Sequence, residues 1–365
     1  MKILHCINSP SVGGLERTTI ELAIQQTKKG IDTSIMVDRV EGEYYDYLVE
    51  NNVPLIISNI KGGFDFNPKT YNRLKKIFDD FDIVHQYNFS PIRAYASYRS
   101  KAAKVYTICG LSKGVRKENA IKYFTRETLK KWFLHKVDAL VTKSRHLIEK
   151  SKEHYGLKHI NISIVSNGST LDKQLAELKK KSANEEFTIG LVSRFIPRKR
   201  VDRLLDGFKM FLDKGGKGQV LLVGDGPSMP DIKKQIEYLE IKDYIKLPGY
   251  QSEMAQFYEV FDIVVHPSDD EGTGNVAIES YLFGKPVIAF SDSGGFKEVL
   301  EPIEPENIVN TNEELSERLL FYYKNKDLIF DESQKRRNYA KENFSIESME
   351  KNYRNIYNQI VNEKN

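Results

Sequence analysis

Short apolar runs alternate with amphipathic helical segments along almost the whole chain. Strands are predicted at residues 3–7, 33–37, 54–57, 82–85, 104–108, 139–142 and 162–165, and again at 187–192, 219–223, 245–247, 263–266 and 286–290. Segments with helical periodicity, such as 18–29 and 69–81, lie between them. Strands separated by helices predict crossover connections and parallel sheets that are covered on both faces.

The same pattern predicts the domain boundaries. A length of 365 residues suggests two domains, and the alternation lapses into a polar, lysine-rich stretch between Asn167 and Glu186. We therefore expect α/β domains of the doubly wound, Rossmann-like type at 1–168 and 187–344, with a linker at 169–186. A final helix at 345–365 is predicted to pack back on the N-terminal domain; the alternative is a surface helix with no such role.

Cysteine content and hydropathy argue against a disulfide-rich, secreted or membrane-spanning protein. The two cysteines, Cys6 and Cys109, lie far apart without a metal-ligand spacing, which favours a reducing compartment and no disulfide framework. The first apolar run is too short for a signal peptide, and no stretch reaches the length of a transmembrane helix. We expect a cytoplasmic protein that needs no metal.

Charge is distributed unevenly. Residues 1–181 carry 31 Lys+Arg against 19 Asp+Glu, a balance of +12, whereas the remainder has a balance of −8. The segment 113–136 places Tyr123, Phe124, Trp132 and Phe133 among eight basic residues. This composition is typical of a helix on a membrane surface; the alternative is that the aromatic side chains pack inward. No nucleic-acid module is apparent.

Two acids mark the second half. Glu271 and Glu279 lie eight positions apart around a glycine-flanked turn that opens an otherwise apolar helix. A buried carboxylate needs polar partners, and the hydroxyls of a sugar or a ribose would supply them. The alternative is that Glu279 complements the positive N-terminus of the helix.

Ligands of open parallel sheets bind beyond the carboxyl ends of the strands. After the first strand, Gly13 and Gly14 precede a helix, where backbone N–H groups suit an anion. This is not the spaced-glycine dinucleotide motif, and a plain tight turn is the alternative.

The second half places more groups in such loops. Arg194 and Lys199 follow the first strand of this half and suit a diphosphate, although a solvated basic loop is the common explanation for such a run. Gly224 begins a turn where backbone must lie close to a ligand or another element, and Tyr250 could flank a flat base. Cations, a base platform and acids at one edge indicate a nucleotide-sugar site.

These motifs, in this order, resemble the family-4 retaining glycosyltransferases of the GT-B fold, also called glycosyl transferases group 1. The resemblance covers essentially the whole chain. It rests on Gly-Gly-x-Glu at 13–16, Val-x-Arg with a later Lys at 192–199, Gly-Asp-Gly-Pro at 224–227, Glu-x7-Glu at 271–279, Gly-x-Pro-Val at 284–287 and the glycines at 294–295. It implies two Rossmann-like domains whose parallel sheets face a central cleft.

The resemblance also implies roles for single residues. Arg194 and Lys199 would bind the donor diphosphate, Glu271 the hydroxyls of the transferred sugar, and Glu279 the ribose. The remaining donor-site residues would be Gly13, Gly14, Gly224, Tyr250, Gly274, Asn275 and Val276. On the acceptor side the candidates are Glu16, His85 and Cys109.

Three positions depart from the family pattern. Cys109 stands where relatives often have a histidine near the acceptor, and a thiol cannot replace an imidazole as a hydrogen-bonding group. Tyr87 replaces a frequent second histidine, and Thr273 a frequent aromatic residue. His85 itself is as easily a structural histidine as a ligand.

The resemblance implies transfer of a hexose or N-acetylhexosamine from a UDP-sugar, with GDP-sugars open, to a glycan or lipid-linked acceptor in bacterial cell-envelope polysaccharide synthesis. No cofactor or metal is expected, and the basic segment would contact the inner face of the cell membrane. A noncatalytic nucleotide-sugar-binding partner is the alternative, favoured by Cys109. An epimerase would lack the Glu-x7-Glu motif, and a dehydrogenase would need the spaced-glycine loop.

Overall fold

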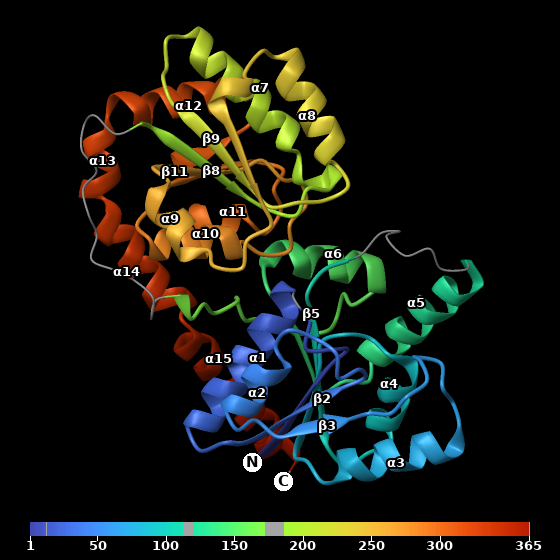
Figure 1. The fold of residues 1–365 in the computed structure, drawn as a ribbon. Coiled ribbons are helices and arrows are strands. Elements are labelled where there is room, and N and C mark those ends of the chain that lie inside the picture. The colour runs from blue at the N-terminus through green and yellow to red at the C-terminus, as the bar shows by residue number, and fades with distance from the viewer. Residues whose placement is uncertain (12, 112–119, 172–185, 365) are drawn as a thin grey trace. The chain divides into compact units, whose positions relative to one another are not determined.

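The computed structural model describes all residues except 12, 112–119, 172–185 and 365, and the chain divides into two compact units (Figure 1). Unit 1 consists of Met1–Gly168 and Ile346–Asn365, and unit 2 is Ser169–Ser345. Most of the predicted linker at 169–186 lies outside the described residues.

Unit 1 is built on a seven-stranded parallel sheet with the order β3-β2-β1-β4-β5-β6-β7. Its strands are β1 (Lys2–Ile7), β2 (Asp32–Val37), β3 (Leu55–Ile57), β4 (Ile83–Gln86), β5 (Ala103–Ile108), β6 (Ala139–Thr142) and β7 (Ile162–Ile164). Its helices are α1 (Gly14–Lys28), α2 (Tyr45–Glu50), α3 (Pro68–Asp79), α4 (Pro91–Tyr98), α5 (Ala120–Leu134), α6 (Arg145–Tyr155) and, from the end of the chain, α15 (Ile346–Lys364).

Unit 2 repeats this plan with a six-stranded parallel sheet in the order β10-β9-β8-β11-β12-β13. Its strands are β8 (Thr188–Val192), β9 (Gln219–Val223), β10 (Ile245–Gly249), β11 (Ile263–His266), β12 (Val287–Phe290) and β13 (Ile308–Val309). Its helices are α7 (Val201–Asp213), α8 (Met229–Tyr238), α9 (Ala255–Val260), α10 (Asn275–Leu282), α11 (Lys297–Leu300), α12 (Asn312–Lys324), α13 (Lys326–Asp331) and α14 (Ser333–Phe344).

The predicted doubly wound architecture is confirmed, since every strand pair in both sheets is parallel. The predicted strands match the observed ones with small differences at their ends. The sequence pattern missed only β13, because two residues are too short a run to show a period of two.

The last helix completes the core of unit 1. Ile346, Met349, Tyr353, Tyr357 and Ile360 of α15 are buried in one cluster with apolar residues of β1, β4 and β5. The alternative of a surface helix is therefore wrong, because this face of the sheet relies on α15 for its cover. On α15 itself, Glu350 is fully buried and pairs with Lys29, which directly follows α1.

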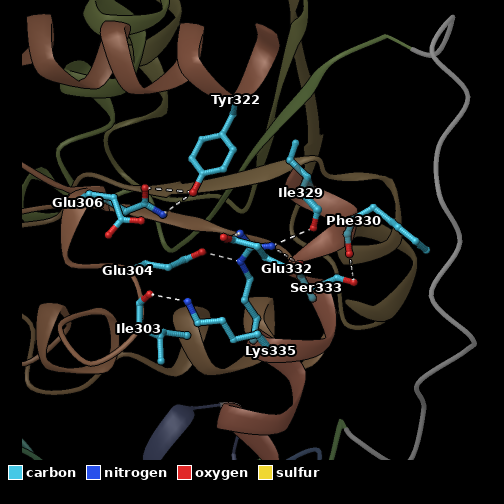
Figure 2. Close-up of polar contacts among 12 residues, drawn as sticks. Ile303, Glu304, Glu306, Tyr322, Ile329, Phe330, Glu332, Ser333 and Lys335 are labelled. Carbon is cyan, nitrogen blue, oxygen red and sulfur yellow. Dashed lines mark hydrogen bonds and ion pairs between the residues drawn. The ribbon is translucent and has the colours of Figure 1, made fainter. Parts of the chain in front are cut away.

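A buried ion pair fixes the end of unit 2. Arg336 of α14 donates to Glu304, and both side chains are almost fully buried. Figure 2 shows Glu304 facing this contact, and the carbonyl oxygen of Ile329 also accepts from Arg336 at 2.9 Å. Close by, the hydroxyl of Tyr322 exchanges hydrogen bonds with the Asn307 amide. Removing one partner of a buried pair leaves an uncompensated charge, so this network holds α13 and α14 on the body of unit 2.

Candidate functional site

Each sheet has one switch point, where the strand order reverses. It lies between β1 and β4 in unit 1 and between β8 and β11 in unit 2. Loops at the carboxyl ends of such strand pairs bind ligands in doubly wound proteins.

In unit 2 the structure brings two of the predicted residues into contact. Lys199, just after β8, donates from Nζ to Oε1 of Glu271 at 2.7 Å, and Arg198 Nη1 lies 3.5 Å from Oε2. The backbone holds Glu271 in place, because its N–H donates to the Ser293 carbonyl and its own carbonyl accepts from Gly295. The loops after β8, β11 and β12 therefore meet at this carboxylate.

Glu271 is buried but stays ionised. Burial alone would raise its pKa, but His266 and Lys199 outweigh burial and lower the pKa to about 2. Nε2 of His266 lies 3.9 Å from Oε1 of Glu271, and its ring stacks on Phe296 with centroids 4.0 Å apart. Burial lowers the pKa of His266 to about 4, so the imidazole is neutral near pH 7. An ionised carboxylate accepts hydrogen bonds only, which suits the hydroxyl groups of a sugar.

Glu279 lies on α10 and accepts a hydrogen bond at 2.7 Å from the buried hydroxyl of Tyr258. The Glu279 side chain is half-buried, whereas Glu271 is buried. The apolar sequence around Glu279 had indicated the opposite order. Glu279 stands beyond the first turn of α10, which contains no acid. Complementing the helix N-terminus is therefore not its role.

The N-terminus of α10 has no side-chain cap. Gly274 occupies the N-cap position and offers no side chain to the first turn, which begins with Asn275 and Val276. The N-terminal end of a helix, with its dipole, favours negative charge. A Cβ on Gly274 would lie 3.0 Å from Val299, so the turn also packs closely on α11.

Glycines let the neighbouring loops pack together. Gly224 has φ of 142°, and a Cβ there would lie 1.8 Å from the carbonyl oxygen of Ser193. At Gly226, with φ of 159°, a Cβ would lie 2.3 Å from the carbonyl oxygen of Phe195. Only glycine fits both requirements. Gly224 thus positions the loop that carries Arg194.

Two predicted donor-site residues are exposed. The exposed guanidinium group of Arg194 makes no hydrogen bond or ion pair with a described residue. Tyr250 follows β10 and is 61% exposed, also without a described side-chain partner. The structure therefore places both at the carboxyl edge of the sheet but does not bring them into contact with Glu271.

In unit 1, Gly13 is the N-cap of α1 and Gly14 its first residue, again without a side-chain cap. A Cβ on Gly13 would lie 2.3 Å from Oε2 of Glu16, because this carboxylate folds back over the turn. Burial raises the pKa of Glu16. Behind the loop, the fully buried Arg93 donates to the carbonyl oxygens of Ile7 and Asn88.

His85 is part of a buried hydrogen-bond network. Its Nδ1 lies 2.6 Å from the hydroxyl of Tyr357 and 2.9 Å from that of Tyr87, and its Nε2 lies 2.7 Å from Oγ1 of Thr107. Burial lowers the pKa of His85 well below its usual value. With both ring nitrogens bonded inside unit 1, the structure gives His85 the structural role that the sequence left open, not a ligand-facing one.

Cys109 follows β5 and is partly exposed. Burial raises the pKa of its thiol, and this effect is larger than the opposing one of Lys143. The thiol is thus neutral and weakly polar, and it cannot supply the hydrogen bonds of an imidazole.

Two residues close to the candidate site residues were not predicted from the sequence. Tyr258, which orients Glu279, is on α9 and gives no local signal. Lys143 directly follows β6 at the carboxyl edge of unit 1, and the rule that ligands bind beyond strand ends could have found it.

The basic segment predicted to contact a membrane is described from residue 120 onward, and 113–119 lie outside the described residues. On α5, Ile121 and Phe124 are 75% and 73% exposed, whereas Phe133 is fully buried. Across the described ranges, no helix combines the length and apolar character needed to span a membrane.

Comparisons with known protein families gave matches over most of the sequence. Glycosyltransferase Family 4 matches residues 12–173, and Glycosyl transferases group 1 matches residues 172–343. The chain is 26% identical to a poly(ribitol-phosphate) alpha-N-acetylglucosaminyltransferase of Staphylococcus aureus over 175 residues, which cover 47% of this chain and 36% of that enzyme. It thus matches little more than a third of this curated relative. An uncharacterized glycosyltransferase of Haemophilus influenzae is 26% identical over 365 residues, which cover 96% of this chain and 98% of that protein.

Among solved structures, Anabaena HepE in complex with UDP aligns with a TM-score of 0.78. The alignment covers 98% of this chain and 100% of that chain at 18% identity, so it shows the fold alone. Taken with two all-parallel sheets, the consecutive family matches across residues 12–343 show that the chain belongs to the family-4, group 1 glycosyltransferases of the GT-B fold.

Proposed function

We propose that the protein is a retaining glycosyltransferase that moves a hexose or N-acetylhexosamine from a nucleotide diphosphate sugar, with UDP favoured over GDP, to a glycan or lipid-linked acceptor. The Lys199–Glu271 pair at the switch point of unit 2 carries this proposal. A partly buried cation and an ionised carboxylate in one place suit the two ends of a sugar–phosphate bond.

Each group has a task that its chemistry supports. Lys199 and the exposed Arg194 stabilise the departing diphosphate, and the N-terminal end of α10 adds to this. Glu271 accepts hydrogen bonds from sugar hydroxyls, and Glu279, oriented by Tyr258, binds the ribose. The acceptor proton passes to a phosphate oxygen of the leaving group. No metal is required in this scheme.

The names of similar proteins support the choice of substrates. The S. aureus relative is named for N-acetylglucosamine transfer to poly(ribitol phosphate), and Anabaena HepE was solved with UDP. We place the activity in bacterial cell-envelope polysaccharide synthesis, in the cytoplasm at the inner face of the membrane. The exposed Ile121 and Phe124 on α5, with basic residues beside them, support contact with the membrane surface.

A thermal-shift screen with UDP- and GDP-sugars identifies the donor, because a bound ligand raises the melting temperature by mass action. Transfer or donor hydrolysis is then measured for Arg194→Ala and Lys199→Ala. We expect each to lower kcat by roughly 10²–10³-fold, in the range for lost transition-state donors. Lys209→Ala is the matched control, since Lys209 pairs with Asp213 on the exposed face of α7. Near-normal turnover in Lys199→Ala would contradict the proposal.

The neutral Cys109 thiol favours one alternative, a noncatalytic nucleotide-sugar-binding partner. This alternative expects the same thermal shift with neither hydrolysis nor transfer. Restoring the family residue with Cys109→His separates the two, because a catalytic site should respond in rate and a binding-only site should not.

A further inference from the structure

Lys143 is a buried cation without a counter-ion. It follows β6 directly and is only 5% exposed. Its Nζ donates to the hydroxyl of Tyr353 at 3.1 Å and lies 5.3 Å from the centre of the same ring. Among the described residues no carboxylate reaches ion-pair distance of this ammonium group. Buried charges are ordinarily paired with an opposite charge.

The side chains that form a hydrogen-bond chain from Lys143 are neutral. The hydroxyl of Tyr353 lies 3.1 Å from Thr107 Oγ1, which in turn lies 2.7 Å from Nε2 of His85. A charged lysine only donates, so the assignment that satisfies every donor runs from Lys143 through Tyr353 and Thr107 to an unprotonated Nε2. This chain orients the ammonium group but does not balance its charge.

A second lysine approaches the same edge from another element. Lys130 on α5 is partly buried, and its Nζ lies 4.9 Å from the ring centre of Tyr155 and 5.9 Å from that of Tyr106. No described carboxylate is within ion-pair distance of it either. Both lysines act electrostatically on the thiol of Cys109 at the end of β5. Glu127 acts electrostatically on Lys130, and Glu16 acts on the same thiol, so the two cations at this strand end are only partly balanced.

This strand end is partly exposed among the described residues. Gly110 is exposed, and no described atom lies within 4 Å of the place where its Cβ would be. Cys109, the residue before it, is partly exposed. Within the described part of the chain, a ligand would therefore approach the carboxyl ends of β5 and β6 past these two residues.

We propose that Lys143, together with Lys130, binds a phosphate group of the acceptor at the carboxyl ends of β5 and β6. The proposal rests on the proposed function in one respect, that unit 1 receives the acceptor. A lysine ammonium group is a compact charge that suits a phosphate. Tyr353, supplied by α15, is the positioning residue. The phosphate can belong to a lipid headgroup or to a soluble phosphorylated glycan, since both present the same group.

The test uses the full-length protein with phenyl phosphate as the probe. Calorimetric titration is done with UDP present at saturation, so that phosphate sites of the donor are occupied. We expect Lys143→Met to weaken phenyl phosphate binding roughly tenfold or more, as for a lost charge-assisted contact, and Lys130→Met to weaken it less. Affinity for UDP should stay unchanged in both variants. Lys101→Met, at an exposed lysine of unit 1, is the matched control.

Tyr353→Phe distinguishes binding from a merely structural role, because it keeps the charge and removes the hydroxyl that orients it. We expect a smaller loss of phenyl phosphate affinity than in Lys143→Met. If Lys143→Met lowers only the melting temperature and leaves both phenyl phosphate affinity and vesicle binding unchanged, the proposal is overturned.

A vesicle arm identifies the source of the phosphate. Co-sedimentation with phosphatidylglycerol vesicles, against phosphatidylcholine alone, should depend on Lys143 if the group is a lipid headgroup. Dependence on Lys143 with either probe supports the site, and dependence with neither overturns it. If phenyl phosphate binds only when UDP is absent, the acceptor site is overturned and the donor site stands. If UDP itself does not bind, the proposed function fails, while the Lys143 dependence remains measurable without it.

Discussion

The two units share a topology but differ in what they place at the switch point. In unit 2, strand ends β8 and β11 present an ion pair, Lys199–Glu271, and the loop after β8 also carries Arg194, which has no ion-pair partner among the described residues. In unit 1, strands β1 and β4 carry neutral imidazoles, His5 and His85, that hydrogen-bond to tyrosine hydroxyls. The same backbone plan therefore carries an ion pair between the loops of unit 2 and neutral, hydrogen-bonded histidines on the central strands of unit 1, which shows that side chains, not topology, assign the chemistry.

The largest effect is expected from two matched glycine substitutions. Gly224→Ala in unit 2 would put a Cβ 1.8 Å from Ser193 O at a positive φ, so we expect the free energy of unfolding to fall by about 3 kcal/mol or more. Gly110→Ala in unit 1 has room and should change it by less than about 0.5 kcal/mol. Urea unfolding of both variants measures the difference, and equal losses would show that the loop packing of unit 2 is not special.

Acid should destabilise unit 1 before unit 2. Burial lowers the pKa of His5 to about 4 and that of His85 well below 6.5, and unit 2 has one such residue, His266, with a pKa of about 4. Because the folded pKa values lie below the unfolded value, the stabilisation is complete above pH 6.5 and is lost as the pH falls from 6.5 towards 4. Each histidine then contributes a loss of about 2 kcal/mol at pH 5.

The single tryptophan, Trp132, lies on α5 and reports on unit 1 alone, whereas circular dichroism reports on both units. Between pH 7 and 5 the Trp132 melting transition should fall further than the remaining circular dichroism transition. His5→Gln should remove part of this dependence, and His159→Gln, at an exposed position, should leave it intact. Parallel movement of the two transitions would contradict the comparison.

The smallest effect comes from removing one hydroxyl. Tyr258→Phe deletes the hydrogen bond to Glu279, and we expect the donor KM to rise about fivefold with little change in kcat, in line with roughly 1 kcal/mol for one hydrogen bond. Tyr322→Phe, which loses a buried contact with Asn307 in the same unit, and Tyr353→Phe in unit 1 should leave the donor KM unchanged. A rise in KM for all three would indicate a general loss of stability instead.

Most of the fold could be predicted from the sequence, because strands and helices each have a local pattern of apolar and polar residues. The runs at 139–142, 219–223 and 263–266 match β6, β9 and β11 residue for residue. Contacts between side chains could not be predicted in this way. His85, for example, hydrogen-bonds to Tyr357, 272 positions later, and no local period encodes such a contact. Lys199 and Glu271 were both singled out by position, but their pairing, and the deeper burial of Glu271, required the structure.

Unit 1 is discontinuous in sequence, since its sheet is covered by α15, which follows all of unit 2. During synthesis on the ribosome, Ile3, Ile83 and Val105 are made early, but the helix that buries them emerges only after the whole of unit 2. The nascent N-terminal sheet must therefore stay partly uncovered while unit 2 is translated. This order of events makes the growing chain, rather than the finished protein, the stage at which aggregation and the need for a chaperone are greatest.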